Sequence, residues 1–211
     1  MIYRVDDIIR DVRVCLDENR RGDDLFAERD VDTLELDVII ASHIEEGARR
    51  VVEAASVEKI HNGHSFMDAA VVEHEDGSGS VALPDDFMRL LSFRMGDWVR
   101  TLHNAITADM PEYEVQQSRF GIRGCPERPV CAYVVTDEGK RLEYYTTQER
   151  PARMVRASYA AYPRLDEGDE SIDLSEDLYA ASVYMIAALT LITLGDGQKA
   201  QSLMEILKPL I

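Results

Sequence analysis

The sequence predicts an α+β fold, in which helices from both ends of the chain form one helical bundle and an antiparallel β region is inserted between them. Apolar residues recur with helical spacing before residue 60 and again after residue 164. Between these parts the pattern changes to the alternation typical of strands, with Gly- and Asp-rich turns. We therefore expect a helical part, 1–60 with 164–211, and a β part with long loops, 61–163.

Two amphipathic helices are expected before the β region. The first runs from residue 6 to about residue 19 and ends before Gly22. The second runs from Asp32 to about Ser56, with Glu35 placed three residues after Asp32 as in a capping box. Its apolar face should contain Leu36, Ile40, Ile44, Gly47, Val51 and Ala55.

The β part should contain two hairpins and a further strand. Apolar stretches at 71–74 and 81–83 flank a turn-rich segment, and 130–135 pairs in the same way with 141–145. A third strand is expected over 154–162. Between 81–83 and a strand from Leu91, Pro84-Asp85-Asp86 predicts one helical turn, because proline and acidic residues favour the first turn of a helix.

The remaining segments are a long excursion and a C-terminal helix pair. Residues 97–129 show no clean period, and we expect a long loop that carries contacts or function. Residues 166–173 form an acidic linker without the spacing of a calcium-binding loop. Asp173 should cap a buried helix over 178–194, Gly195 should end it, and a last helix should run from Asp196 towards Pro209.

The charge balance disfavours general binding of nucleic acid. Forty acidic and 23 basic residues give a formal net charge of −17, the wrong sign for a protein that displaces counterions from phosphates. An acidic surface also keeps a protein soluble. Three cysteines without a Cys-x-x-Cys pair fit a reducing compartment. The apolar run 178–194 is short for a bilayer, so no membrane partner is expected.

Catalytic motifs are not apparent in the sequence. It contains no Gly-x-Ser-x-Gly motif. His61 and His64 are spaced like metal ligands, yet the Asn62-Gly63 pair between them predicts a turn, so we interpret them as a solvated loop. Cys125 and Cys131 lie in a stiff, proline-containing loop and are interpreted as free thiols. We therefore expect no enzyme activity and no cofactor.

Several short segments resemble the head-to-tail connector proteins of tailed bacteriophages. They are Leu83-Pro84-Asp85-Asp86-Phe87-Met88-Arg89, Arg128-Pro129-Val130 with Ala132-Tyr133, Leu142-Glu143-Tyr144-Tyr145, and Gly195-Asp196 at the break in the final helical segment. The chain is similar to the ring-forming tail tubular adaptors of short-tailed phages, including the crAss-like group. It departs from them after Tyr145, where the related proteins often have an early proline and this chain has Pro151.

This resemblance implies a structural virion protein at the head–tail junction, assembled in the host cytoplasm. It implies a ring, commonly of about twelve copies, whose partners are itself, the portal protein and the next tail or ring protein. DNA would pass through without specific binding. An acidic channel wall would repel the genome over a Debye length of about 8 Å and keep it sliding.

Two sets of residues are candidates for these roles. The candidates for subunit or partner contacts are Arg119, Phe120, Ile122, Arg123 and Arg128, because arginine and aromatic residues are common interface anchors. The candidates for an acidic channel lining are Asp166, Glu167, Asp169 and Glu170. Two other functions remain open: a small metal-dependent enzyme that uses His61 and His64, and an acidic mimic of DNA that occupies a nucleic-acid-binding protein.

Overall fold

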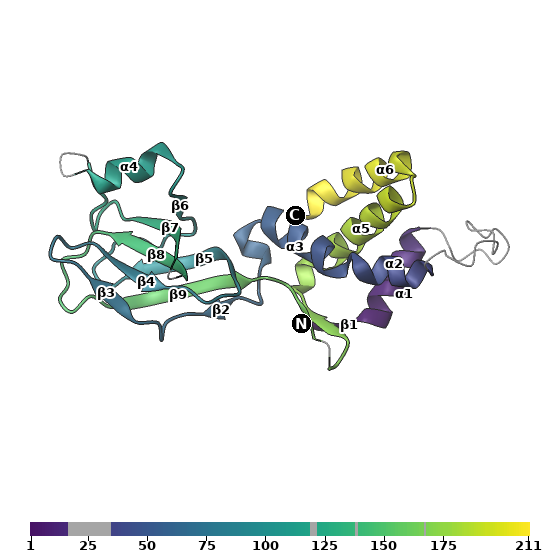
Figure 1. Cartoon of the computed structure of the whole chain (residues 1–211), viewed down its shortest axis with the longest axis horizontal. Coiled ribbons are helices and arrows are strands. Elements are labelled where there is room, and N and C mark those ends of the chain that lie inside the picture. The colour runs from purple at the N-terminus through teal and green to yellow at the C-terminus, as the bar shows by residue number, and fades with distance from the viewer. Residues whose placement is uncertain (17–34, 119–121, 138, 167) are drawn as a thin grey trace. The chain divides into compact units, whose positions relative to one another are not determined.

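The computed structural model describes residues 1–16, 35–118, 122–137, 139–166 and 168–211, and its fold is α+β (Figure 1). The chain divides into two compact units. The helical unit comprises Met1–Asn62 and Pro163–Ile211, and the β unit comprises Gly63–Tyr162. The sequence-based boundaries, 60/61 and 163/164, lie within two residues of these. The β unit is therefore one continuous stretch of the chain, whereas the helical unit contains residues from both chain ends.

The helical unit contains a small sheet in addition to its helices. From the N-terminal segment come β1 (Ile2–Arg4), α1 (Val5–Cys15), α2 (Leu36–Ser42), α3 (Ile44–Ala54) and the 3-10 turn η1 (Val57–Lys59). From the C-terminal segment come β10 (Leu165–Asp166), β11 (Ser171–Asp173), α5 (Glu176–Thr193), α6 (Gly197–Leu207) and η2 (Lys208–Leu210). The strands pair in the antiparallel order β1-β11-β10, so the two chain ends are hydrogen-bonded to each other.

Helix α5 lies at the centre of the helical unit and packs against α1, α3 and α6 (Figure 1). It is apolar on nearly all sides, and 61% of its length is buried within the structure. By length and composition alone it could also cross a membrane. Its partners contribute the apolar faces expected from the sequence, including Ile8 and Val12 of α1 and Ile44 and Val51 of α3. Burial of these faces explains their 3.6-residue spacing.

The expectation of one continuous helix over 32–56 is wrong. In the described part of this range, the chain forms α2 and α3, separated at His43. The backbone N–H of His43 bonds to the Ile40 carbonyl in a tight turn, and the carbonyl of His43 accepts the N–H of Gly47 at the start of α3. Both segments bury their apolar residues in the same core. Packing in this core therefore outweighs the continuity of the helix. The expected helix limits at Asn19, Gly22 and Asp32 lie outside the described residues.

Two further expectations for the C-terminal segment are corrected. The acidic linker is instead the β10–β11 hairpin, and Asp173 belongs to β11 rather than to a helix cap. Ser175 is the residue before α5, and its hydroxyl bonds to Asn62 instead of the helix. Gly195 does end α5, with φ of +85°, and the carboxylate of Asp196 accepts the amide of Lys199 at the start of α6.

The β unit consists of two sheets. The five-stranded sheet has the order β3 (Val71–Glu73), β4 (Gly79–Ala82), β8 (Gly139–Tyr145), β7 (Val130–Thr136) and β6 (Ile106–Thr107). The other sheet has the order β2 (His64–Ser65), β9 (Met154–Ala161) and β5 (Phe87–Met95). Both expected hairpins are confirmed. Among the described residues, pairing is antiparallel except between β6 and β7.

The strand expected from Leu91 begins earlier, at Phe87. Pro84-Asp85-Asp86 form a turn rather than a helical turn, and the Phe87 N–H bonds to the Pro84 carbonyl at 3.0 Å. Antiparallel pairing with β9 along its full length holds β5 in the extended conformation. Phe87 and Leu90 are both buried in the main core of the unit. The local preference of proline and aspartate for a helix start is therefore outweighed by pairing of the following strand with β9.

The excursion over 97–129 contains β6 and one short helix, α4 (Pro111–Gln117). Its first part is fixed by Trp98, which is fully buried and packs edge-to-face against Phe93. Its later part follows the sheet face that carries Ala132, Val134 and Tyr145, where Tyr113 of α4 packs. The opposite face of the same sheet packs into the main core through Leu142 and Tyr144. Alternate residues of β8 therefore face two different environments.

Candidate functional site

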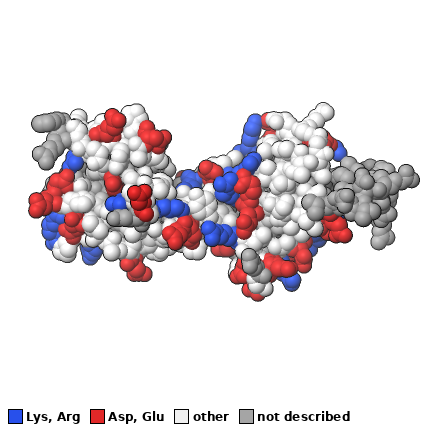
Figure 2. Space-filling model, in the orientation of Figure 1, with Lys and Arg blue, Asp and Glu red and all other residues white. Residues whose placement is uncertain are grey.

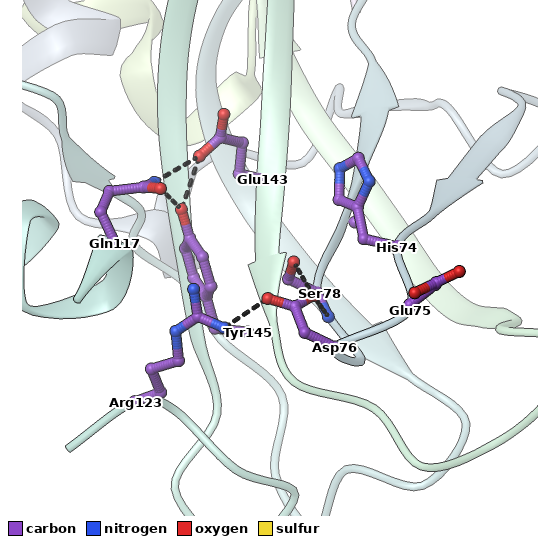
Figure 3. A pocket seen from close by; sticks show the side chains of 9 residues that line it. His74, Glu75, Asp76, Ser78, Gln117, Arg123, Glu143 and Tyr145 are labelled. Carbon is purple, nitrogen blue, oxygen red and sulfur yellow. Dashed lines mark hydrogen bonds and ion pairs between the residues drawn. The ribbon is translucent and has the colours of Figure 1, made fainter. Parts of the chain in front are cut away.

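A cavity of about 330 Å³ lies in the β unit, at the face of the five-stranded sheet where Tyr145 lies (Figure 3). Three separate parts of the chain form its wall: the turn between β3 and β4, Gln117 of α4 with Arg123, and β8. The lining residues are His74, Glu75, Asp76, Ser78, Gly79, Gln117, Arg123, Glu143 and Tyr145. We refer to it as the Glu143 pocket.

One carboxylate oxygen of Glu143 is held by three donors. Its Oε2 accepts hydrogen bonds from the Tyr145 hydroxyl at 2.5 Å, the Tyr113 hydroxyl at 3.1 Å and the Gln117 side-chain amide at 3.3 Å. The Gln117 amide also donates to the Tyr145 hydroxyl at 2.7 Å. Burial, followed by the hydrogen bond to Glu143, raises the pKa of Tyr145 well above its ordinary value. Tyr145 is therefore a protonated donor near neutral pH.

A second network fixes the opposite wall of the pocket. Asp76 Oδ1 accepts from the Ser78 hydroxyl at 2.6 Å and from the Ser78 amide at 3.1 Å. Asp76 Oδ2 forms an ion pair of 2.5 Å with Arg123 Nη1. The hydrogen bond from Ser78 has the largest effect and that from Arg123 the next largest. Together they hold the pKa of Asp76 far below its usual value. Asp76 is therefore ionised throughout the neutral range.

The backbone around Arg123 is tied to α4. Arg123 Nε donates to the Gln116 carbonyl at 2.7 Å, and the buried Gln116 side chain accepts the amide of Gly124 at 2.7 Å. On the other side of the pocket, Gly79 leaves no room for a side chain, because a Cβ would lie 2.2 Å from the Tyr144 hydroxyl and from the Val72 carbonyl. Both walls of the pocket are thus built from fixed backbone.

The arrangement suits binding better than nucleophilic chemistry. The Ser78 hydroxyl donates its hydrogen to Asp76, whose depressed pKa makes it a weak base. Glu75, Asp76 and Glu143 against Arg123 give the lining a formal charge of −2 with histidine neutral. Asp76 is already paired, so the excess negative charge lies on Glu75 and Glu143. The pocket therefore presents one carboxylate fixed by hydrogen bonds, Glu143, and one exposed carboxylate, Glu75.

Comparison with protein-family models finds no match. Comparison with curated proteins likewise finds no relative. The geometry of the described residues is therefore the basis for the functional argument.

The predicted contact residues divide into three groups. Arg119 and Phe120 lie outside the described residues. Ile122 is 86% exposed, and Arg128 is exposed in a turn where its backbone pairs with that of Cys125. Arg123 instead lines the Glu143 pocket and forms an ion pair within its own chain. Only Ile122 and Arg128 are thus described as free surface positions.

The predicted channel residues lie at the β10–β11 hairpin of the helical unit. Asp166 is in β10 and accepts the Gly168 amide at 2.8 Å, whereas Asp169 and Glu170 are exposed in the connecting turn. Glu170 has φ of +46°, and its carbonyl accepts the Val5 amide. Figure 2 shows acidic residues gathered where this hairpin lies. Glu167 lies outside the described residues.

The two candidate metal-ligand histidines belong to different units. His61, in the helical unit, has its Nε2 at 2.9 Å from the Asp177 carboxylate. His64, in β2, pairs with Tyr159 of β9. Within the described ranges, no group of three or more His, Cys, Asp or Glu side chains is arranged to hold a metal ion. Cys125 and Cys131 are both free thiols.

The Glu143 pocket was not identified from the sequence. Alternation along β8 places Glu143 and Tyr145 on one face, so this half of the site was accessible from the strand pattern. The Asp76–Arg123 pair joins residues 47 positions apart, and no local signal connects them. Arg123 was selected from the sequence as a contact residue, and its place in the pocket had no local sequence signal.

Proposed function

We propose that this protein is a structural virion protein, a head-to-tail connector that assembles into a ring between the portal and the next tail component. In this proposal the helices of the two chain ends form a bundle that packs against neighbouring copies. The inserted β unit contacts the components above or below the ring. DNA passes through the centre without sequence-specific binding.

The main support for this proposal is the division of the chain into a helical unit and a β unit. Helices from both ends belong to one unit and a single β insertion forms the other, which is the organisation of the connectors that the sequence resembles. The resembling segments lie at structural junctions: 83–89 leads from β4 into β5, and Gly195-Asp196 separates α5 from α6. Residues 142–145 lie in β8, at the Glu143 pocket.

The charge of the chain supports the same proposal. Twelve copies at −17 each would carry a formal charge of −204. DNA has about one negative charge per 1.7 Å of its axis, so an acidic lining repels it at close range. The exposed residues Asp166, Asp169 and Glu170 are available for this lining.

Electron microscopy with the cognate portal tests the proposal. The full chain and the portal, purified separately and mixed, should yield rings or density bound to the portal. Particles without rings and without portal-bound density, at concentrations where other connectors assemble, would exclude the connector function. A monomer or dimer that instead binds a nucleic-acid-binding protein in a salt-sensitive manner would favour the DNA mimic.

Surface variants test which loop makes the contacts. Ile122→Asp places a charge on an 86% exposed apolar residue of the predicted contact loop and should abolish ring formation. Val135→Asp makes the same kind of change at a 65% exposed residue outside that loop, so it serves as the matched control. Equal assembly of the two variants would remove Ile122 from the interface.

A further inference from the structure

We propose that the Glu143 pocket binds a guanidinium group, such as that of an arginine side chain. The proposal rests on the acceptors that the pocket leaves open, not on its acidic composition alone. Glu143 Oε2 is saturated by three donors, whereas among the described residues no partner contacts its Oε1. The Glu75 carboxylate, likewise, has no partner in the described part of the chain.

The pocket is prepared for such a ligand before it arrives. Tyr145, Tyr113 and Gln117 fix the plane of the Glu143 carboxylate, so little side-chain entropy is lost on binding. Arg123 is held away from Glu143 by Asp76 and by the Gln116 carbonyl. The guanidinium of Arg123 is therefore already bound to other groups, and an external cation can approach Oε1 of Glu143.

The chemistry of the lining favours guanidinium over other cations. Guanidinium has five N–H donors in a planar fork and no acceptor, which suits a wall with open carboxylate oxygens. A bound metal ion would need several converging ligands, and the described residues contain no group of three that could supply them. A volume of about 330 Å³ is at the lower end for ligand sites and suits one side chain better than a cofactor.

Titration of the full chain with N-acetyl-L-arginine amide, followed by NMR, tests this site. We expect saturable shifts of the Gln117 side-chain amide and the Gly79 backbone amide, with a dissociation constant of about 1–10 mM, as for a single charged group. N-acetyl-L-citrulline amide has nearly the same shape without the charge and should bind at least about tenfold more weakly. Equal binding of the two probes, or no saturable shift with arginine, would overturn the proposal.

Two variants locate the interaction. Glu143→Gln keeps one oxygen acceptor for the tyrosines and should weaken arginine binding about tenfold or more. Glu75→Gln changes an exposed carboxylate without a described partner, so folding is preserved, and it should weaken binding about two- to fivefold. Glu112→Gln removes the same charge from exposed α4, outside the pocket, and should change binding less than twofold. Equal losses in all three variants would indicate only nonspecific charge attraction and refute the site.

Further experiments identify which molecule supplies the guanidinium group. If a second copy of the chain supplies it, Glu143→Gln should also lower self-association in sedimentation experiments, whereas Glu112→Gln should not. If a free compound supplies it, the arginine probe should bind while both variants sediment like the wild type. Tight binding of Ca²⁺ or Zn²⁺ alone that is lost in Glu143→Gln would overturn the guanidinium assignment. Because the probe is monomeric, its binding is independent of whether the proposed ring forms.

Discussion

Substitution of Gly47 tests the packing of α3 against α5. A Cβ at this position would lie 2.6 Å from Ile186 Cγ1 and 3.3 Å from the Ile186 backbone nitrogen. Ile186 is fully buried, and a β-branched side chain in a helix has essentially one rotamer, so Cγ1 cannot move aside. Gly47→Ala should therefore separate the two helices.

The expected magnitude is the difference between two opposing effects. Alanine improves helix propensity by about 1 kcal/mol over glycine. Overpacking of a filled core costs about 1–3 kcal/mol. We expect a net loss of up to about 2 kcal/mol in the free energy of unfolding. Urea denaturation followed by far-UV circular dichroism measures this loss.

In the Ile186→Ala protein, the effect of Gly47→Ala on stability should have the opposite sign. Ile186→Ala removes Cγ1, so only the milder 3.3 Å approach to the backbone nitrogen is left, while the gain in helix propensity remains. Gly47→Ala should then stabilise the Ile186→Ala protein by about 0.5–1 kcal/mol, a coupling that a double-mutant cycle detects. Gly197→Ala, at the start of α6 with no atom within 4 Å of the new Cβ, is the matched control and should stabilise slightly. If Gly47→Ala stabilises the wild-type protein as Gly197→Ala does, the close approach of α3 and α5 is incorrect.

Three other predictions concern the β unit. Trp98→Phe removes an indole N–H that bonds to a backbone carbonyl at 2.9 Å and should cost about 1–3 kcal/mol in thermal or urea unfolding; no change would contradict its buried position. The pKa of Asp76 is lowered in the folded state, chiefly by the hydrogen bond from Ser78. Its contribution to stability is therefore present above the ordinary pKa of 3.8 and is lost as pH falls below that value. Asp76→Asn should reduce this acid sensitivity by up to about 1 kcal/mol, because the carboxylate is 48% exposed, and unchanged pH curves would count against the pairing. Burial raises the pKa of the Cys131 thiol, so thiol reagents should label it only after unfolding, and rapid labelling of the native protein would place it at the surface.

Periodicity predicted the elements whose residues are buried on one side. The spacing of Ile8 and Val12, and that of Ile40 and Ile44, follows from packing in one core with the central helix α5. The hairpins were accessible for a similar reason, because turn residues separate strands that are adjacent in sequence. In both cases the information is local.

The remaining elements depend on distant partners. Neither glycine nor proline stands at His43 or next to it, so the local sequence does not indicate the break between α2 and α3; packing in the core determines it. The β10–β11 hairpin looks like an acidic linker because its pairing partner, β1, is at the other end of the chain. The Glu143 pocket has the same character, with walls from three segments that only the fold brings together.

The position of Arg123 connects the pocket with the proposed contact surface. Its guanidinium bonds to Asp76 and to the Gln116 carbonyl, so it anchors the segment on which the exposed Ile122 lies. Exposed apolar residues contribute to association when their backbone is already ordered, because the entropy of ordering does not then oppose binding. The polar network that shapes the Glu143 pocket therefore also fixes Arg123, the residue next to the exposed Ile122. Loss of the Asp76–Arg123 pair should weaken both functions, whereas Glu143→Gln should weaken the pocket alone if a free compound is its ligand.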